Sequence, residues 1–422
     1  MMDKQQANDD CACERTSSEC RRWLGRLALL TVAVLLLLCG AEIAFRILGW
    51  RPLTDVEFDP VFGRHFVPGK VGVTTIESFV VSRINSHGFR DREYSFEKPP
   101  GVFRIVVLGD SFVEALQVPL EKSFHKLLEA RLNAAGGGRR FEVISFGMSG
   151  NGTGQELLYY RHWALRFKPD LTLVGMYWQN DIVDNSKELC ALIGNWMERP
   201  FFEWRDGRLV LDNSHIELQR RLEAQRKDKR TSWLHRLRTK WVRRYSYFLD
   251  FMFTQAWYAR NAWQEWRGRT NKEPAYRRFY DVCLPETPPE WQRAWDLTEH
   301  ILVQLRDECA KTHSPLAVFE VTLATQLYDD YRNRLYKSCP ELRRYDWEKP
   351  GRLLQIMMDR LQVPYLPMSA TFKADFKQTG QYAHGHALGP VGHWNEHGHD
   401  VAARQIERFL RENNLISKPT QP

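Results

Sequence analysis

The sequence predicts an α/β protein whose parallel sheet carries helices on both faces. Short apolar segments typical of buried strands alternate along the chain with segments of helical periodicity, and turn residues separate them. Hydrophobic residues make up 43% of the 422 residues and charged residues 27%, which are ordinary values for a packed globular protein. This composition excludes wholesale disorder, a collagen-like chain and a polytopic membrane protein.

The first part of the predicted sheet lies in residues 101–194. Its apolar runs are bounded by turn residues, and the segments between them repeat apolar side chains every three or four positions. In chain order we expect a strand at 104–108, a helix at 124–132, a strand at 141–146, a helix near 155–167 and a strand at 171–177.

The same alternation resumes in residues 296–416 and completes the predicted domain. Strands connected by helices in this order form a parallel sheet with helices on its two faces. Residues 52–100 are polar and turn-rich and are expected to form a lead-in segment, whereas residues 195–295 break the pattern and are predicted to be a helical insertion. The expected elements of the second part are a helix near 295–312, a strand near 316–321, a helix at 353–361, a short strand near 363–366 and a helix near 401–412.

An apolar segment near the N-terminus has the length of a membrane span. Residues 27–41 contain no charge, and the apolar stretch continues past Glu42 to Phe45. As a helix, these 19 residues would measure ~28 Å, close to the hydrocarbon thickness of a bilayer. We therefore predict a transmembrane anchor at residues 27–48.

Arginines before this segment indicate its orientation. Arg21, Arg22 and Arg26 favour a cytoplasmic N-terminal segment, residues 1–26, and place the main domain on the periplasmic or extracytoplasmic side of the cell membrane. A cleaved signal peptide is the alternative interpretation, because residues 39–41 (CGA) offer small side chains at the cleavage positions.

The positive charge of the chain is concentrated in the insertion. The net charge is +8, and residues 215–244 alone carry eleven Lys or Arg against three acidic residues. Residues 195–295 also contain nine of the fifteen tryptophans. Apolar side chains recur there every three or four positions, on one face of a helix, at Leu234, Leu237, Trp241, Tyr245, Phe248 and Met252.

Three interpretations of the insertion are open. It is a solvated helix that packs its apolar face on the core, a helix that rests on the membrane to which the protein is tethered, or a groove for an anionic glycan or lipid headgroup. Nucleic acid is not expected as a partner, since an exported domain would not meet it. The side chains expected to contact substrate or membrane are Trp233, Trp241, Arg238 and Arg244.

Neither the cysteines nor the histidines match a metal-binding motif. The histidines near the C-terminus lack the spacing of a zinc site with its general base, so we expect no metal and no cofactor. Four cysteines lie in the main domain, an even number that would allow disulfides in an exported protein, with a pairing that the sequence does not assign: Cys190, Cys283, Cys309 and Cys339.

Polar and glycine-rich segments follow the predicted strands at their carboxyl ends, where open parallel sheets bind their ligands. They are GDS at 109–111, FGMSGNGTG at 146–154 and QND at 179–181, and a GHWN segment at 392–395 precedes the last helix. A serine at a strand end is placed as a nucleophile, and a histidine in a neighbouring loop is placed to remove its proton. A glycine N–H and a carboxamide would stabilise an oxyanion, each being worth about 10²–10³ in rate.

The chain resembles the SGNH (GDSL-type) serine esterases and acyltransferases, a family named for four residues in four blocks. All four occur in order: Ser111 in LGDS, Gly150 in MSGNGT, Asn180 in QND and His393 in GHWN. The resemblance extends from residue 85 to residue 415 without the insertion. It is closest to membrane-anchored members in which an NSxGFRD segment, here NSHGFRD at 85–91, precedes the GDS strand.

The resemblance implies a fold and a set of roles. The fold would be a three-layer α/β/α arrangement with a flavodoxin-like sheet. Ser111 would be the nucleophile and His393 its base, and the oxyanion hole would consist of the Ser111 N–H, the Gly150 N–H and the Asn180 side chain. The LGDSF context differs from the G-x-S-x-G elbow of α/β-hydrolases.

One departure from the family concerns the acidic residue that orients the histidine. The family supplies an acid two or three residues before it, but Val391 and Pro390 occupy these positions. Loss of the orienting acid costs about 10⁴ in kcat in serine proteases. A Ser–His dyad, or a carboxylate from elsewhere in the chain, would therefore be needed, and the candidate donors are Asp375, Asp181 and Asp184.

The sequence thus predicts an anchored SGNH-type hydrolase or acyltransferase that acts through an acyl-Ser111 intermediate. The resemblance implies small acyl groups, with O-acetyl esters of a cell-envelope polysaccharide as the expected substrate and a lipid ester as the alternative. An integral-membrane protein that donates the acyl group would be a further partner. A catalytically inactive envelope protein that binds glycans or assembles a complex is the alternative from another class.

Overall fold

The computed structural model divides into two compact units, which are described separately. One unit contains residues 1–51 and 232–257, and the other contains residues 52–231 and 258–422. Within them, the structure describes residues 2–53, 56–75, 77–135, 138–194, 198–214, 216–218, 221, 242, 245–268, 275–385, 390 and 392–417.

A five-stranded parallel sheet forms the centre of the second unit. In chain order its strands are β5 (Val102–Gly109), β6 (Arg140–Gly147), β7 (Leu171–Met176), β10 (Leu316–Glu320) and β11 (Tyr365–Leu366). The spatial order is β11-β10-β7-β5-β6, with all neighbouring strands parallel. This is the flavodoxin-like order: β6 lies on one side of the first strand, β5, and the later strands β7, β10 and β11 are added on its other side. The predicted fold class is confirmed.

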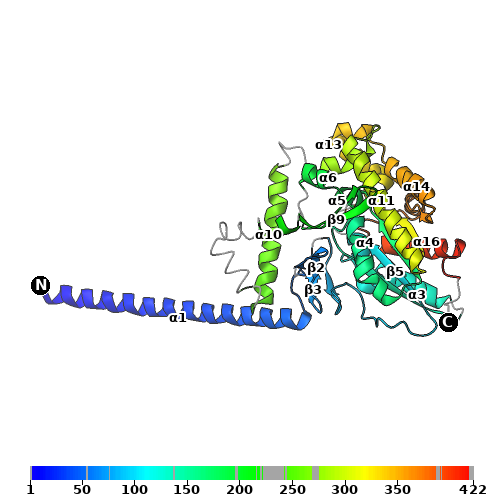
Figure 1. Ribbon diagram of the computed structural model, residues 1–422. Helices are drawn as coiled ribbons and strands as arrows, with labels where there is room; N and C mark the ends of the chain where they lie inside the picture. The colour runs from blue at the N-terminus through cyan, green and yellow to red at the C-terminus, as the bar shows by residue number, and fades with distance from the viewer. Residues whose placement is uncertain are drawn as a thin grey trace. The chain divides into compact units, whose positions relative to one another are not determined.

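Helices cover both faces of this sheet (Figure 1). The connection from β5 to β6 runs through α3 (Phe124–Ala134), and the connection from β6 to β7 runs the opposite way through α4 (Thr153–His162). Because both crossovers are right-handed, α3 and α4 lie on opposite faces. The C-terminal helix α16 (Glu396–Glu412) packs beside α3, and α11 (Pro289–Lys311) packs beside α4.

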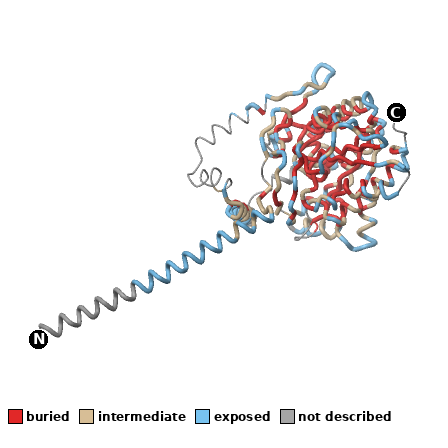
Figure 2. Tube along the Cα trace, turned by 90° about the horizontal axis from the view of Figure 1, so that it is seen from below, coloured by how far each residue is buried: buried red, intermediate tan, exposed pale blue. Residues whose placement is uncertain are grey.

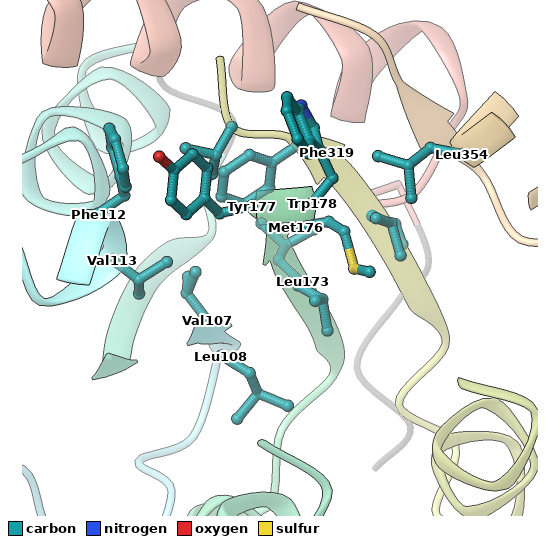
Figure 3. Packing of buried hydrophobic residues seen from close by; sticks show 14 of the residues in the cluster. Val107, Leu108, Phe112, Val113, Leu173, Met176, Tyr177, Trp178, Phe319 and Leu354 are labelled. Atoms are coloured by element: carbon teal, nitrogen blue, oxygen red, sulfur yellow. The ribbon is translucent and has the colours of Figure 1, made fainter. Parts of the chain in front are cut away.

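The core of this unit consists of the sheet and the helix faces that cover it. Every residue of β5 and β7 is buried, as expected for strands covered on both sides (Figure 2). Figure 3 shows side chains of β5 and β7 in this core together with Phe112 and Val113, which follow β5 directly. The core therefore supports the segment that carries Ser111.

The lead-in segment contains strands that its polar composition did not predict. Two antiparallel hairpins are formed, one by β1 (Val56–Asp59) with β2 (Gly63–Phe66) and the other by β3 (Val71–Thr74) with β4 (Val80–Arg83). They end at the NSHGFRD segment. Its Arg90 side chain is buried and donates hydrogen bonds to the carbonyl groups of Glu114, Ala115 and Val118, which follow Ser111 closely in the chain.

The remaining described elements of the second unit surround the sheet. A hairpin of β8 and β9 occupies part of the expected insertion, and short helices follow the carboxyl ends of the strands. Cys190, Cys283 and Cys309 are buried as free thiols. These elements are α2 (Ser111–Glu114), α5 (Trp178–Asn185), α6 (Lys187–Ile193), β8 (Phe201–Arg205), β9 (Arg208–Asp212), α12 (Ala324–Leu327), α13 (Asp329–Ser338), α14 (Lys349–Leu361), α15 (Ser369–Thr379) and short 3₁₀ turns at Leu120–Lys122, Ala164–Phe167, Ala275–Cys283 and Pro340–Arg344.

The described residues of the first unit lie mainly in two helices. Helix α1 (Met2–Leu48) contains a segment, Arg21–Leu48, that is long and apolar enough to be a membrane span or a signal sequence and is not covered by the rest of the protein. The first part of α10 (Tyr247–Gly268) belongs to the same unit. Its N-terminal end contacts the last turns of α1.

Candidate active site

Ser111 is the first residue of α2, directly after β5. The preceding Asp110 caps this helix, because its Oδ1 accepts a hydrogen bond from the Phe112 N–H at 2.9 Å. Ala115 ends the helix after a single turn in a left-handed conformation, with φ of 56°. The tight strand–helix turn holds Ser111 at the carboxyl end of the sheet, beside the position where the strand order reverses.

His393 lies against the Ser111 hydroxyl. The distance between His393 Nε2 and Ser111 Oγ is 2.7 Å, and the imidazole packs against the Phe112 ring with their centroids 4.7 Å apart. The His393 backbone is also held, since its carbonyl accepts a hydrogen bond from the Gly385 N–H at 2.9 Å. The sequence places these two residues 282 positions apart, and the fold brings them into hydrogen-bond contact.

Glu77, in the loop between β3 and β4, supplies the carboxylate that the GHWN segment lacks. Its Oε1 lies 2.6 Å from His393 Nδ1, and its Oε2 accepts a hydrogen bond from the His393 backbone N–H at 2.9 Å. A carboxylate only accepts, so Nδ1 carries the imidazole proton and Nε2 is left to accept the proton of Ser111. Ser, His and Glu thus form one chain of hydrogen bonds.

The three aspartates expected to replace the missing acid have other partners. Asp375 lies 2.6 Å from Nε2 of His397, on the next helix. Asp184 is buried in an ion pair with Arg199. Asp181 accepts a hydrogen bond from the Tyr177 N–H at 2.7 Å, at the start of α5. The expectation that one of these three orients His393 is therefore corrected in favour of Glu77.

The sequence contains little that distinguishes Glu77 from other acids of the lead-in segment. It stands in VTTIESF, which has none of the spacing to the histidine that the family pattern uses. The loop is anchored just after α2, because the Ser78 hydroxyl donates to the Gln117 carbonyl at 2.6 Å. Only this packing brings the hairpin over the active site.

Asn180 lies at the same edge of the sheet as Ser111. It belongs to α5, directly after β7, and its Nδ2 donates a hydrogen bond to Asp110 Oδ2 at 3.0 Å. The amide carries a second N–H. Asn180, Ser111 and His393 line one cavity of about 320 Å³, so this second donor is available for an oxyanion there.

Gly150 follows β6 in a turn with a positive φ of 76°. This loop lies beside α2, because the Ser149 hydroxyl donates to the Glu114 carboxylate. The close approach requires glycine at position 147, where a Cβ would lie 2.1 Å from the Glu114 backbone nitrogen. The cavity itself is lined by Ser111 and Asn180 and not by Gly150, so the part of Gly150 in an oxyanion hole stays a prediction.

Aromatic side chains form the walls of this cavity. Phe112 and Tyr177 come from the carboxyl ends of β5 and β7, Tyr280 comes from the last part of the expected insertion, and Tyr331 comes from α13. Aromatic rings of this kind stack on the apolar faces of ligands.

Buried carboxyl groups surround the Ser–His pair. Burial raises the pKa of Asp110 to about 6, against the lowering effect of the Phe112 N–H and of His393, and burial raises the pKa of Glu114 to about 7. For His393, burial disfavours the imidazolium, but the hydrogen bond and charge of Glu77, together with the charges of Asp110 and Glu114, outweigh it. The pKa of His393 is therefore raised above its ordinary value of 6.5.

Other histidines near the C-terminus have protein partners. His384 is buried, its Nε2 lies 2.7 Å from the Thr322 carbonyl, and burial lowers its pKa to about 4. His399 Nδ1 accepts a hydrogen bond from the Phe124 N–H at 3.2 Å. The predicted contact residues Trp233, Trp241, Arg238 and Arg244, by contrast, lie outside the described residues.

Comparisons with known proteins find low similarity. No family model matches the chain, and no curated protein matches it. Among similar solved structures are an acetyl xylan esterase from Geobacillus stearothermophilus (12% identity, TM-score 0.35, 76% of this chain and 97% of that chain) and a lipase/acylhydrolase from Enterococcus faecalis (12%, 0.36, 76% and 100%). A GDSL-like lipase from Bacteroides thetaiotaomicron has 10% identity and a TM-score of 0.32, over 74% of this chain and 88% of that chain. The case for a function therefore depends on the site geometry.

A substitution at Gly392 is expected to separate the carboxylate from the histidine. Gly392 has a φ of +95°, and a Cβ there would lie 2.5 Å from Glu77 Oε2. The flexible carboxylate would move away, so we expect Gly392→Ala to lower kcat/KM toward the level of Glu77→Gln. Backbone strain at a positive φ costs about 1–3 kcal/mol of stability. Ester turnover and thermal unfolding measure the two effects.

Gly380→Ala is the matched control for this substitution. Gly380 has a φ of +70°, but a Cβ there would meet nothing within 4 Å. It imposes the same kind of backbone strain without touching the site. Equal activity of the two variants would contradict the role given to the Glu77–His393 contact.

Proposed function

We propose that the protein is a membrane-anchored serine esterase or acyltransferase that acts through an acyl-enzyme on Ser111, with His393 as its base and Glu77 as the orienting acid. The observation that carries this proposal is the hydrogen-bond chain from Ser111 Oγ to His393 Nε2, at 2.7 Å, and from His393 Nδ1 to Glu77 Oε1, at 2.6 Å. A nucleophile, a base and a group that orients the base in such a chain define an activated serine.

In the first half-reaction, Ser111 Oγ attacks the carbonyl carbon of an ester, and its proton moves to His393 Nε2. The negative charge that develops on the carbonyl oxygen is stabilised by the Ser111 N–H and the Asn180 amide. His393 then gives the proton to the departing alcohol oxygen, the ester C–O bond breaks, and Ser111 carries the acyl group. Glu77 stabilises the imidazolium throughout.

In the second half-reaction, water or a sugar hydroxyl attacks the acyl-Ser111 carbonyl. His393 accepts the proton of the attacking group and returns it to Ser111 Oγ as the acyl–serine bond breaks. Attack by water makes the protein a hydrolase, and attack by a sugar hydroxyl makes it a transferase. The alternative of an inactive scaffold depended on the missing acid, and Glu77 removes that reason.

We propose O-acetyl esters of a cell-envelope carbohydrate as substrates. The cavity at Ser111 is about 320 Å³ and is lined by Tyr177, Tyr280 and Tyr331, which suits a sugar ring beside a small acyl group better than a long acyl chain. Helix α1 would tether this activity to the membrane, and an integral-membrane protein would be a source of acyl groups for a transferase.

The experiment that tests the function compares acyl-chain lengths on the purified full-length protein. We expect turnover of 4-nitrophenyl acetate and of acetylated xylan, with an intact-mass increase of one acetyl group on Ser111 after rapid quenching. Preference for a long-chain ester would favour a lipid substrate instead. No turnover and no acyl adduct on the folded protein with any of these esters would contradict the proposed function.

The activity is expected to fall at acidic pH, because only neutral His393 accepts the serine proton. Since Glu77 raises the pKa of His393, the acidic limb of the kcat/KM profile should lie above pH 6.5 in the native protein. Glu77→Gln removes the carboxylate charge that raises the pKa of His393, so the acidic limb of the kcat/KM profile should move to lower pH. A limb that stays in place in this variant would contradict the assignment of Glu77 as the partner of His393.

A further inference from the structure

The first part of helix α10, residues 247–257, exposes several large apolar side chains although two of its polar side chains are buried, unlike a helix whose apolar face is packed entirely on a protein core. Asp250 and Thr254 are buried, at 1% and 4% exposure. Four large apolar side chains of this part are 40–51% exposed; we call them the apolar stripe: Leu249, Met252, Phe253 and Trp257.

The beginning of α10 is attached to the last turns of α1 by the carboxylate of Glu42. This carboxylate accepts hydrogen bonds from the Ser246 hydroxyl at 2.7 Å and from the Tyr247 and Phe248 N–H groups at 3.1 Å each. The first N–H groups of a helix have no carbonyl partner within the helix itself, and the helix dipole also favours a negative charge at this position.

Further contacts close this junction. Arg46 donates a hydrogen bond to the Tyr245 carbonyl at 2.7 Å. The centroid of the Phe45 ring lies 5.3 Å from the ring centroid of Phe248 and 5.2 Å from that of Phe251. Figures 1 and 2 together show that α10 runs across the direction of α1, as a helix in the membrane plane would beside a helix that crosses the membrane.

The junction lies at one end of the apolar segment of α1. The uncharged part of that segment, residues 27–41, ends directly before Glu42, and these 15 residues span ~23 Å as a helix, most of one hydrocarbon thickness. Leu249 of the apolar stripe shares an apolar cavity of about 360 Å³ with Leu35 and Leu38 of α1. If α1 crosses a bilayer, the start of α10 lies at the level where the hydrocarbon core of the bilayer meets the headgroups on the extracytoplasmic side.

We infer that the first part of α10, residues 247–257, is an interfacial helix whose apolar stripe contacts the lipid of the membrane that α1 crosses, with Glu42 as the link between the two helices. This inference rests on the membrane anchoring proposed above and is independent of the catalytic triad. The outward apolar and aromatic side chains are those that interfacial helices bury at the level of the headgroups.

Photo-crosslinking of the full-length protein in lipid nanodiscs tests the inference. Benzoylphenylalanine replaces Met252 in the apolar stripe, Leu36 in the span or Leu211 in β9 as the control; these side chains are 49%, 67% and 38% exposed. We expect lipid adducts by mass spectrometry at positions 252 and 36 and not at 211.

Each other result has a defined meaning. Adducts at 36 without adducts at 252 would overturn the interfacial helix and leave the anchor. Absence of lipid adducts at position 36 would overturn both the membrane anchor and the interfacial helix. This conclusion would hold whether or not the protein shows esterase activity. A cross-link from 252 to a second copy of the chain would identify the apolar stripe as a protein interface and overturn the lipid assignment.

A second variant tests the link through Glu42. Glu42→Gln removes the negative charge that the start of α10 binds, while the glutamine keeps the size of the side chain. We expect the lipid adducts at 252 to fall toward the level at 211, whereas those at 36 and the turnover of a soluble ester remain as in the native protein. Unchanged adducts at 252 would show that Glu42 does not hold α10 at the membrane.

Discussion

Ser111→Ala is expected to abolish ester turnover and to leave the fold intact. In serine proteases, loss of the nucleophile lowers kcat by about 10⁶, and the residual rate comes from the oxyanion hole and substrate binding. The serine hydroxyl contributes one hydrogen bond, to His393, so the free energy of unfolding should change by only about 1 kcal/mol. Labelling with a fluorophosphonate and detection by intact mass measure the reactivity of the serine directly.

Ser369→Ala is the matched control for this substitution. Ser369 also begins a helix after a strand of the same sheet, and its hydroxyl donates to the Glu320 carboxylate at 2.6 Å. It should retain the labelling and turnover of the native protein. A single adduct that is present in the native protein and in Ser369→Ala but absent in Ser111→Ala is the expected result, and an adduct that persists in Ser111→Ala would place the nucleophile elsewhere.

Glu77→Gln is expected to have the second largest effect. The amide would still fill the loop, but it would present an N–H or a neutral oxygen to His393 Nδ1 and would not stabilise the imidazolium. The equivalent change in serine proteases lowers kcat by about 10⁴, or ~5.5 kcal/mol of transition-state stabilisation. Steady-state kinetics on 4-nitrophenyl acetate would show the loss mainly in kcat.

Asp375→Asn provides the matched control for Glu77→Gln. Asp375 also binds a histidine, with Oδ2 2.6 Å from His397 Nε2, and belongs to the same C-terminal region of the fold. It does not contact the Ser111–His393 pair, so its kcat should remain near that of the native protein. A large loss in Asp375→Asn together with a small loss in Glu77→Gln would reverse the assignment of the acid.

The alternation of strands and helices was predictable because buried parallel strands leave a strong local signal. The predicted runs at 104–108, 141–146 and 171–177 correspond to β5, β6 and β7, with boundaries that differ by up to two residues. The hairpins of the lead-in segment left a weaker signal. Their strands are four residues long and partly exposed, so that neither a continuous apolar run nor a strict alternation marks them.

In the insertion, apolar side chains that their periodicity would place on the core are exposed in the structure. The spacing of Tyr245, Phe248 and Met252 predicts one apolar face of a helix, which in the first interpretation packs on the core. In the structure, Tyr245 and Met252 are 56% and 49% exposed, whereas Asp250 is buried. Periodicity identifies an apolar face, but the packing of neighbouring elements decides which medium that face meets.

By itself, the sequence determined the α/β class and the positions of Ser111, Asn180 and His393 at one edge of the predicted sheet. It did so because hydrophobic periodicity is local, and because the carboxyl ends of parallel strands must meet at the same edge. Only the tertiary structure decided which acid orients His393. Glu77 reaches it through a hairpin 316 residues away in the chain, and a contact across that distance depends on how the hairpin packs beside the nucleophile turn rather than on any neighbour in the sequence.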